Sequence, residues 1–223
     1  MVNPGLENKE ISYKGDIDSG NYDDADFNSD LDAINSYNRM INSKVEDFRE
    51  EMKRLPYVDL SKKVEDGLVS TPNGNRPLPK RYLSKKEIDE HLKLFEDGVV
   101  KIVSQESFSR TLKYYSGYIE PESGQFVMPK FVYEKAVKAS NGNPRILEEL
   151  LGLEKGFLGE NPVVIEPKEL KFLKFPSGNE PGAYVGLWQP PGFTKGGIPE
   201  AVINQLAPDE YINKKVYEGV LNK

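Results

Sequence analysis

The sequence predicts an α+β protein, in which a helical amino-terminal region precedes a small mixed α/β domain with a twisted, mainly antiparallel sheet. Three observations predict this class. Apolar residues recur at intervals of three or four over one long early stretch, which is typical of an amphipathic helix. Later, short Val- and Ile-rich runs alternate with helical patterns and with Gly- and Pro-rich turns. The charge also divides the chain, since residues 1–70 carry 16 acidic and 9 basic side chains, whereas residues 71–223 carry 20 and 21.

Composition excludes several classes of site. The chain has 223 residues and no cysteine, which excludes disulfide scaffolds, thiolate zinc sites and cysteine nucleophiles. Because the chain has a single histidine, His91, multi-histidine metal centres and two-histidine ribonuclease mechanisms are also excluded. We expect no structural metal and, because neither part of the chain is strongly basic, no duplex DNA partner. No apolar run approaches the roughly 18 residues of a membrane span, and no secretory signal is expected at the amino terminus.

The amino-terminal region, residues 1–70, is expected to be acidic and helical and to serve delivery or docking. An Asp-rich stretch at residues 16–26 faintly resembles a calcium loop that is one residue short, and we take it as the acidic start of a helix. The helix is predicted over residues 26–55, and Pro56 stops it. Its apolar stripe must pack against the second domain, a partner or another copy of the chain, and consists of Phe27, Leu31, Ile34, Tyr37, Ile41, Val45, Phe48, Met52 and Leu55.

Residues 71–80, with three prolines and a glycine, are predicted to be a linker before an α+β effector domain at residues 81–223. Ser84 and Glu87 form a capping-box pattern at the start of the domain's first helix. Asn143 and Pro144 open another helix, which Gly152 closes. The other predicted elements, in order, are strands at 99–103 and 125–128, a helix at 130–140, and strands at 163–165 and 200–203.

Residues 176–199 form a long Gly- and Pro-rich loop whose aromatic side chains favour an ordered, ligand-facing structure. Glu180 lies inside it, and Glu200 stands where it enters an apolar strand. A glutamate at such a junction is held on one side and open on the other, which suits a group that orients a hydroxyl or stabilises an oxocarbenium-like centre. The alternative interpretation of Glu200 is an edge-strand charge that blocks sheet-to-sheet pairing.

Residues 81–215 resemble the carboxy-terminal toxin domains of bacterial polymorphic toxins of the contact-dependent, Rhs and LXG types. Four segments carry the resemblance: Gln125–Pro129, Gly156–Val163, Pro176–Ala183 and Pro191–Val202. The resemblance implies a cognate immunity protein as partner, with a possible docking partner for the amino-terminal helix. It also implies export by a specialised system and action in the cytoplasm of a target cell, or a cytoplasmic location if the protein is not exported.

Within that class, the order of segments is similar to ADP-ribosyltransferase-type domains, which implies that the domain acts on NAD as a transferase or glycohydrolase. Glu200 then corresponds to the late glutamate that orients the ribose, with Glu180 as a second catalytic candidate. Ile198 occupies the position at which such domains carry a further Glu or Gln. The resemblance assigns Arg81 or Arg110 to the NAD phosphates and Phe126 to a place near the nicotinamide ring, and the further candidates for NAD binding are Asn179 and Trp188.

Two alternatives stay open. A metal-independent ribonuclease toxin would use a cleft built from His91, Arg110, Glu180 and Lys195. A non-enzymatic structural or interaction protein would dock through helix 26–55.

Overall fold

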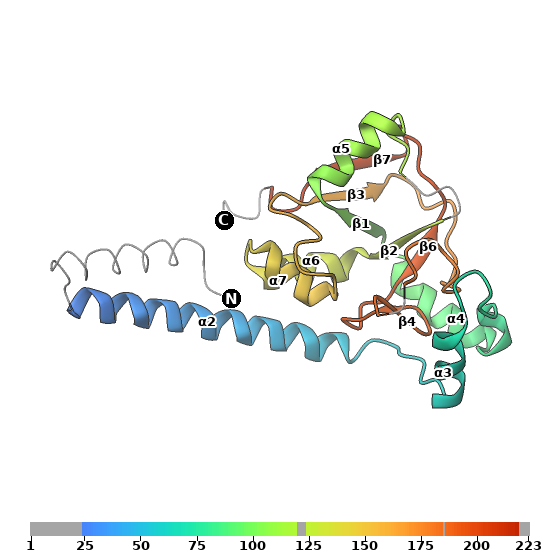
Figure 1. Ribbon diagram of the computed structural model, residues 1–223, viewed down its shortest axis with the longest axis horizontal. Coiled ribbons are helices and arrows are strands. Elements are labelled where there is room, and N and C mark those ends of the chain that lie inside the picture. The colour runs from blue at the N-terminus through green and yellow to red at the C-terminus, as the bar shows by residue number, and fades with distance from the viewer. Residues whose placement is uncertain (1–23, 120–123, 185, 219–223) are drawn as a thin grey trace.

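The computed structural model describes residues 24–119, 124–184 and 186–218. Within them the chain forms six α-helices, a five-stranded antiparallel sheet and a separate two-stranded sheet, which confirms the α+β class (Figure 1). The residues before Asp24, including most of the Asp-rich stretch predicted to start the long helix, lie outside the described part. The helices are α2 (Asp24–Met52), α3 (Lys62–Ser70), α4 (Lys85–Leu92), α5 (Gln105–Tyr114), α6 (Lys130–Ser140) and α7 (Pro144–Leu151), with short 3-10 turns η1 (Pro79–Arg81) and η2 (Lys93–Phe95).

The larger sheet has the strand order β6-β2-β1-β3-β7, and each neighbouring pair is antiparallel. Its strands are β1 (Val99–Val103), β2 (Gln125–Pro129), β3 (Val163–Pro167), β6 (Ala201–Ile203) and β7 (Tyr211–Lys215). The smaller sheet is a hairpin of β4 (Trp188–Gln189) and β5 (Phe193–Thr194), which lies inside the Gly- and Pro-rich loop.

The larger sheet forks at its centre. β1 and β2 pair only where Val99 faces Pro129 and Val100 faces Met128. Beyond that point the two strands turn to different neighbours, because residues 101–103 of β1 pair with β3 while residues 125–127 of β2 pair with β6. The fork therefore leaves a gap between two strands that would otherwise share a continuous ladder.

A hydrophobic core lies on each face of the sheet. On one face, Val100, Ile102 and Val164 join apolar side chains of α2, α6 and α7. On the other, Val99, Val163 and Ile165 pack with Phe95 and with Phe108 of α5. Covering both faces explains why β1 and β3 are apolar almost throughout rather than alternating with polar residues.

The second half of α2 is part of the domain's core. Ile41, Val45, Phe48 and Met52 are buried in the cluster that also contains α6 and α7. The ion pairs Arg49–Glu149 and Lys135–Glu51 flank this contact. The second half of the apolar stripe therefore packs against the second domain, one of the three partners that the sequence allowed. The first half of the helix extends beyond the body of the protein (Figure 1).

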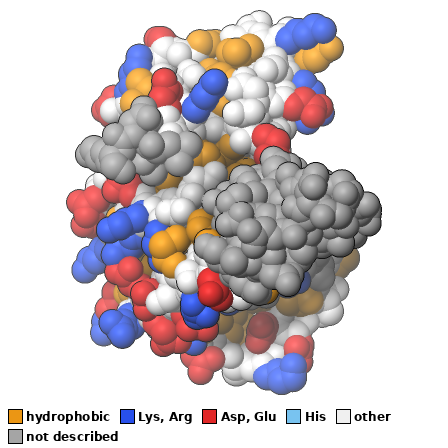
Figure 2. Space-filling view, turned by 90° about the vertical axis from the view of Figure 1, so that its left-hand side faces the viewer, with side chains coloured by type: hydrophobic (Ala, Val, Ile, Leu, Met, Phe, Trp, Pro, Cys, Tyr) orange, Lys and Arg blue, Asp and Glu red, His pale blue; other side chains and the backbone are white. Residues whose placement is uncertain are grey.

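Charge is mixed on one end of the molecule. On the face seen end-on from the left of Figure 1, basic and acidic side chains are interspersed rather than gathered into patches of one sign (Figure 2). Such a surface offers few clustered phosphate contacts to a long nucleic acid.

Besides the β4–β5 hairpin and the turn η1, two elements of the domain have no counterpart in the sequence-based expectation. β7 buries only Tyr211, and its other four residues are exposed, so it lacks the apolar alternation of a typical strand. α5 buries only Phe108 and is capped by Ser104, whose hydroxyl accepts a hydrogen bond from the backbone N–H of Ser107. Both elements form because neighbouring segments supply their partners.

Candidate active site

The fork in the sheet opens into a pocket of about 260 Å³. Residues of β1 and β2 on either side of the fork form its inner walls, and the Gly- and Pro-rich loop forms its outer wall. Charged side chains reach the pocket from two elements: Lys101 belongs to β1, and Glu200 immediately precedes β6. The remaining lining is mainly apolar and aromatic: Phe126, Leu153, Phe157, Tyr184, Leu187 and Trp188. An apolar cavity with a few convergent polar groups is the usual form of a ligand site.

The main chain of Glu200 is fixed at both ends. Its N–H donates to the carbonyl of Gly192 at 2.9 Å. Its carbonyl oxygen lies 2.8 Å from Nε2 of His91, so the tautomer with a proton on Nε2 donates to it. Because both backbone groups are held, the Glu200 side chain enters the pocket from a rigid support.

His91 acts from behind the pocket and does not line it. Its side chain is only 1% exposed and lies among the rings of Phe95, Phe175 and Phe193 at centroid distances of 5.5, 4.6 and 5.3 Å. Burial lowers the pKa of His91, and the hydrogen bond to Glu200 opposes that shift only in part. The ring is therefore neutral near pH 7 and supports the backbone.

Glu200 and Lys101 have displaced proton affinities. Loss of water contact raises the pKa of Glu200 to about 8; the positive charge of Lys101 opposes the rise and the negative charge of Glu180 adds to it. The same loss of water contact lowers the pKa of Lys101 to about 8, against the effect of Glu200. Among the described residues, no side chain donates a hydrogen bond to the Glu200 carboxyl group. A carboxyl group and an amine whose pKa values both lie at about 8 inside one pocket are suited to acid–base catalysis.

Trp188 forms the outer aromatic wall and is held from behind. It is 4% exposed. Gly178 lies under its ring at a φ of +76°, and a β-carbon there would come within 2.5 Å of the indole. The guanidinium of Arg76 stacks on the same ring, 4.9 Å from its centroid. The glycine and the buried arginine together set the position of this wall.

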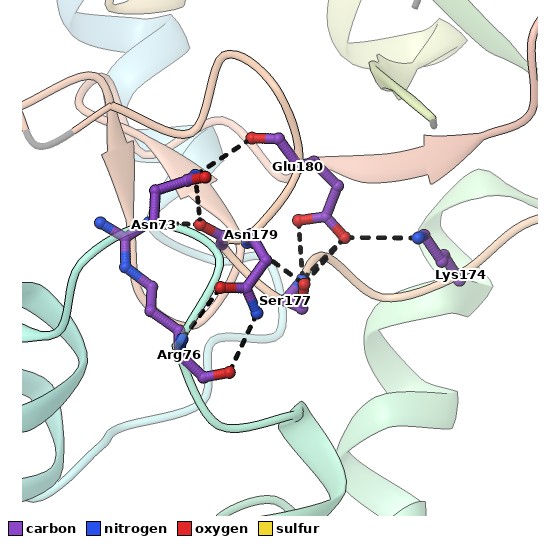
Figure 3. Close-up of polar contacts among 7 residues, drawn as sticks. Asn73, Arg76, Lys174, Ser177, Asn179 and Glu180 are labelled. Carbon is purple, nitrogen blue, oxygen red and sulfur yellow. Dashed lines mark hydrogen bonds and ion pairs between the residues drawn. The ribbon is translucent and has the colours of Figure 1, made fainter. Parts of the chain in front are cut away.

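A second group of polar residues, the loop cluster, orders the Gly- and Pro-rich loop beside the pocket. It consists of Asn73, Arg76, Lys174, Ser177, Asn179 and Glu180 (Figure 3). Glu180 is 4% exposed and accepts hydrogen bonds from the backbone N–H of Ser177 at 3.1 Å and from its hydroxyl at 3.0 Å. The ammonium of Lys174 lies 3.5 Å from the same carboxylate. Glu180 therefore closes a turn of the loop and does not line the pocket.

The loop cluster also joins residues 71–80, predicted as a linker, to the domain. The side-chain oxygen of Asn179 accepts from the N–H groups of Gly74 and Arg76 at 2.8 and 2.9 Å, and its amide donates to the Arg76 carbonyl at 2.9 Å. The Arg76 guanidinium, which is 5% exposed, donates to the carbonyls of Leu68, Thr71, Gly178 and Ala183. Carbonyl oxygens thus satisfy this buried cation.

The predicted site residues fall into three places. Glu200, Phe126 and Trp188 line the pocket. Glu180 and Asn179 belong to the loop cluster behind its outer wall. Arg81 in η1 and Arg110 on α5 are exposed and do not line the pocket, and Arg110 donates to the hydroxyl of Ser107 on its own helix. Order along the chain predicts a phosphate-binding role for these two arginines, but the tertiary fold does not bring them to Glu200.

The structure adds Lys101 to the site. The signal for it is a single lysine inside the otherwise apolar strand Val99–Val103, where an unpaired buried charge would be costly. A charged residue in the middle of a central strand needs either a partner or a cavity, and Lys101 lines a cavity in which the charge of Glu200 acts on it.

Within the described ranges, no group of three His, Asp or Glu side chains could hold a metal ion. Nor does any helix in those ranges combine the length and apolar character needed to cross a bilayer. Comparison of the chain with protein-family models and with curated proteins found no match. The fold and the site define an α+β protein with an aromatic pocket that is lined by a carboxyl group and an amine, Glu200 and Lys101.

Proposed function

We propose that this protein is an enzyme that cleaves the bond between nicotinamide and ribose in NAD, with Glu200 as the catalytic residue. The observation that carries the proposal is the placement of Glu200 and Lys101 in an aromatic pocket at the fork of the sheet. A pocket of about 260 Å³ suits one ring and its sugar better than a whole dinucleotide. Its aromatic walls favour a planar ring such as nicotinamide.

The proposed reaction is a hydrolysis. The bond between C1′ of the ribose and the nicotinamide nitrogen breaks, and its electron pair leaves with nicotinamide, which becomes neutral. The ribose passes through an oxocarbenium-like state that the ionised Glu200 carboxylate stabilises. A water molecule adds its oxygen to C1′, and its proton passes to Glu200 and then to solvent. The products are nicotinamide, ADP-ribose and a proton.

Lys101 has a supporting role in this proposal. Its positive charge favours the ionised form of Glu200, which the cleavage requires. Replacement of Lys101 by Met would keep most of its apolar volume but remove the charge. The carboxyl group would then hold its proton more tightly, and cleavage would slow at pH 7.

The test uses the purified full chain with NAD, and nicotinamide release is measured by chromatography. Glu200→Gln keeps the shape of the side chain and removes its charge, and we expect kcat to fall by about 100-fold or more, as for the loss of a main stabilising group. Glu106→Gln, at an exposed position of α5, is the matched control and keeps full activity. Cleavage of RNA with NAD left intact, or full NAD cleavage by Glu200→Gln, would contradict the proposal.

We also propose that the enzyme is a toxin effector with an immunity protein as partner, as the resemblance of residues 81–215 implies. Expression in bacterial cells should deplete NAD and stop growth, and Glu200→Gln should abolish both effects. Growth arrest at a normal NAD level would assign the toxicity to another reaction. The other ribonuclease candidates do not converge, since His91 is buried behind Glu200 while Lys195 and Arg110 are exposed at separate places.

A further inference from the structure

A second hollow adjoins the pocket. This groove has a volume of about 690 Å³ and runs between the end of α2, the end of α7 and the turn at residues 195–197. It shares Gly152 and Leu153 with the pocket at the fork, so the two hollows meet at the end of α7. A ligand anchored in the pocket can therefore continue into the groove.

The surface between the two hollows is kept low by two glycines. Gly152 has a φ of +69°, and a β-carbon on it would lie 2.1 Å from the backbone nitrogen of Gly196. The two backbones touch because neither residue has a side chain. The end of α7 and the turn at residues 195–197 are therefore in direct backbone contact where the two hollows meet, and Gly152 has no side chain to extend into either hollow.

The groove has three basic side chains, one of which has no ion pair among the described residues. Arg49, Lys53 and Lys195 line it, against a single acidic residue, Glu149. Arg49 is paired with Glu149 at 2.6 Å, and Lys53 with Glu50 at 2.6 Å. The Lys195 side chain is exposed and has no ion pair within the described residues. Lysine and arginine at the rim of a groove favour phosphate groups.

An aromatic surface completes the groove. Tyr57 is 60% exposed, and its ring lies 5.0 Å from that of Phe193, tilted by 44°. Phe193 in turn contacts His91 behind Glu200, so Tyr57 is held against the support of the active site. An exposed ring with a fixed back is suited to stacking with a purine base.

We infer that this groove binds the adenosine diphosphate half of NAD, with the diphosphate near Lys195 and the adenine on Tyr57. The inference rests on the proposed function, because the nicotinamide end must occupy the pocket at the fork. It also makes the end of α2, in the amino-terminal region, part of the enzyme's substrate site. In the groove, Lys195 supplies a free basic side chain for the phosphates, which Arg81 and Arg110 do not bring to the pocket.

The test compares two substrates that share the bond to be cleaved. NAD carries the adenosine diphosphate half, whereas nicotinamide riboside carries neither phosphate nor adenine. We expect Lys195→Glu to raise KM for NAD about tenfold, the factor for losing one charge-assisted contact, and to leave KM for the riboside unchanged. Tyr57→Ala should show the same selectivity. Arg39→Ala removes an exposed cation of α2 that lies outside the groove and serves as the control.

Each outcome bears on a different statement. A selective rise in KM for NAD supports the groove as the adenosine diphosphate site. Unchanged KM for NAD, or an equal change for both substrates, overturns the groove while leaving NAD cleavage in place. If the unmodified protein cleaves neither substrate, the proposed function fails and this inference fails with it.

Discussion

The loop cluster and the pocket each contain a glutamate and a lysine, yet the carboxyl groups of the two glutamates differ in the hydrogen bonds that they accept. In the loop cluster, Glu180 accepts hydrogen bonds from both the backbone and the hydroxyl of Ser177 and lies 3.5 Å from Lys174. In the pocket, Glu200 has its backbone held while its carboxyl group receives no hydrogen bond from any described residue. A satisfied buried carboxylate stabilises a loop, and an unsatisfied one is available for chemistry.

The largest expected effect on stability comes from replacing Glu180, the glutamate whose carboxylate accepts hydrogen bonds. Glu180→Ala leaves the buried Ser177 N–H without its acceptor and Lys174 without its partner, and should lower the free energy of unfolding by about 3 kcal/mol. Urea denaturation measures the change, with Glu169→Ala at an exposed position as the control. A loss below about 1 kcal/mol, the size of an ordinary surface substitution, would mean that Glu180 does not hold the loop.

Replacement of Glu200, in contrast, is expected to raise the free energy of unfolding. The folded protein holds the Glu200 proton up to a pH of about 8, whereas the unfolded chain releases it near 4.5. Between those values the unfolded state gives up the proton first, so this group lowers stability as the pH rises. Glu200→Gln does not titrate and should be more stable than the unmodified protein at pH 8 by about 2 kcal/mol, less than the full shift because the side chain is only half-buried.

The pH dependence of that difference provides the check. Denaturation of the two proteins at several pH values should show the gain growing from pH 4.5 to 8 and vanishing below pH 4.5. A constant difference across this range would place the Glu200 carboxyl in water, with an ordinary pKa.

A smaller effect is expected in the pH profile of NAD cleavage. The reaction needs Glu200 ionised and Lys101 charged, and the pKa of each is about 8. The plot of kcat/KM against pH should therefore rise to a maximum near pH 8 and fall by several-fold one pH unit to either side. In Lys101→Met the alkaline decline should disappear, and its persistence would assign that limb to another group.

The smallest effect is expected for the arginines chosen from the sequence. Arg81 and Arg110 lie outside the pocket and the groove. Arg81→Ala and Arg110→Ala should each change KM for NAD by less than about twofold, within the range of surface substitutions. A large rise in KM for either variant would mean that the phosphates lie along a different surface.

Local patterns predicted the regular elements well where the signal lies within a few residues. Ser84 and Glu87 form the capping box that their spacing predicts. Asn143 caps α7, and Gly152 ends it in the left-handed conformation. The strands beginning at Val99, Gln125 and Val163 also form as predicted.

The site was predictable only in part. Glu200, Phe126 and Trp188 lie together at the pocket, as a functional loop next to a core strand would suggest. The pairing of Glu200 with Lys101 was not predictable, because the two residues are brought together only by the separate partners of β1 and β2. The opposite fates of Glu180 and Glu200 also depend on contacts with residues about 100 positions away, such as Asn73 and His91.

The sequence by itself determined the α+β class, the caps of the helices and the apolar strands, since these depend on side-chain spacing and on hydrogen bonds between near neighbours. Tertiary structure alone decided where the sheet forks, which elements cover the apolar stripe of α2, and which glutamate receives no hydrogen bond from the described residues. The physical reason is that strand register and burial are settled by segments that meet only after folding, and burial then determines the proton affinity of each charged group.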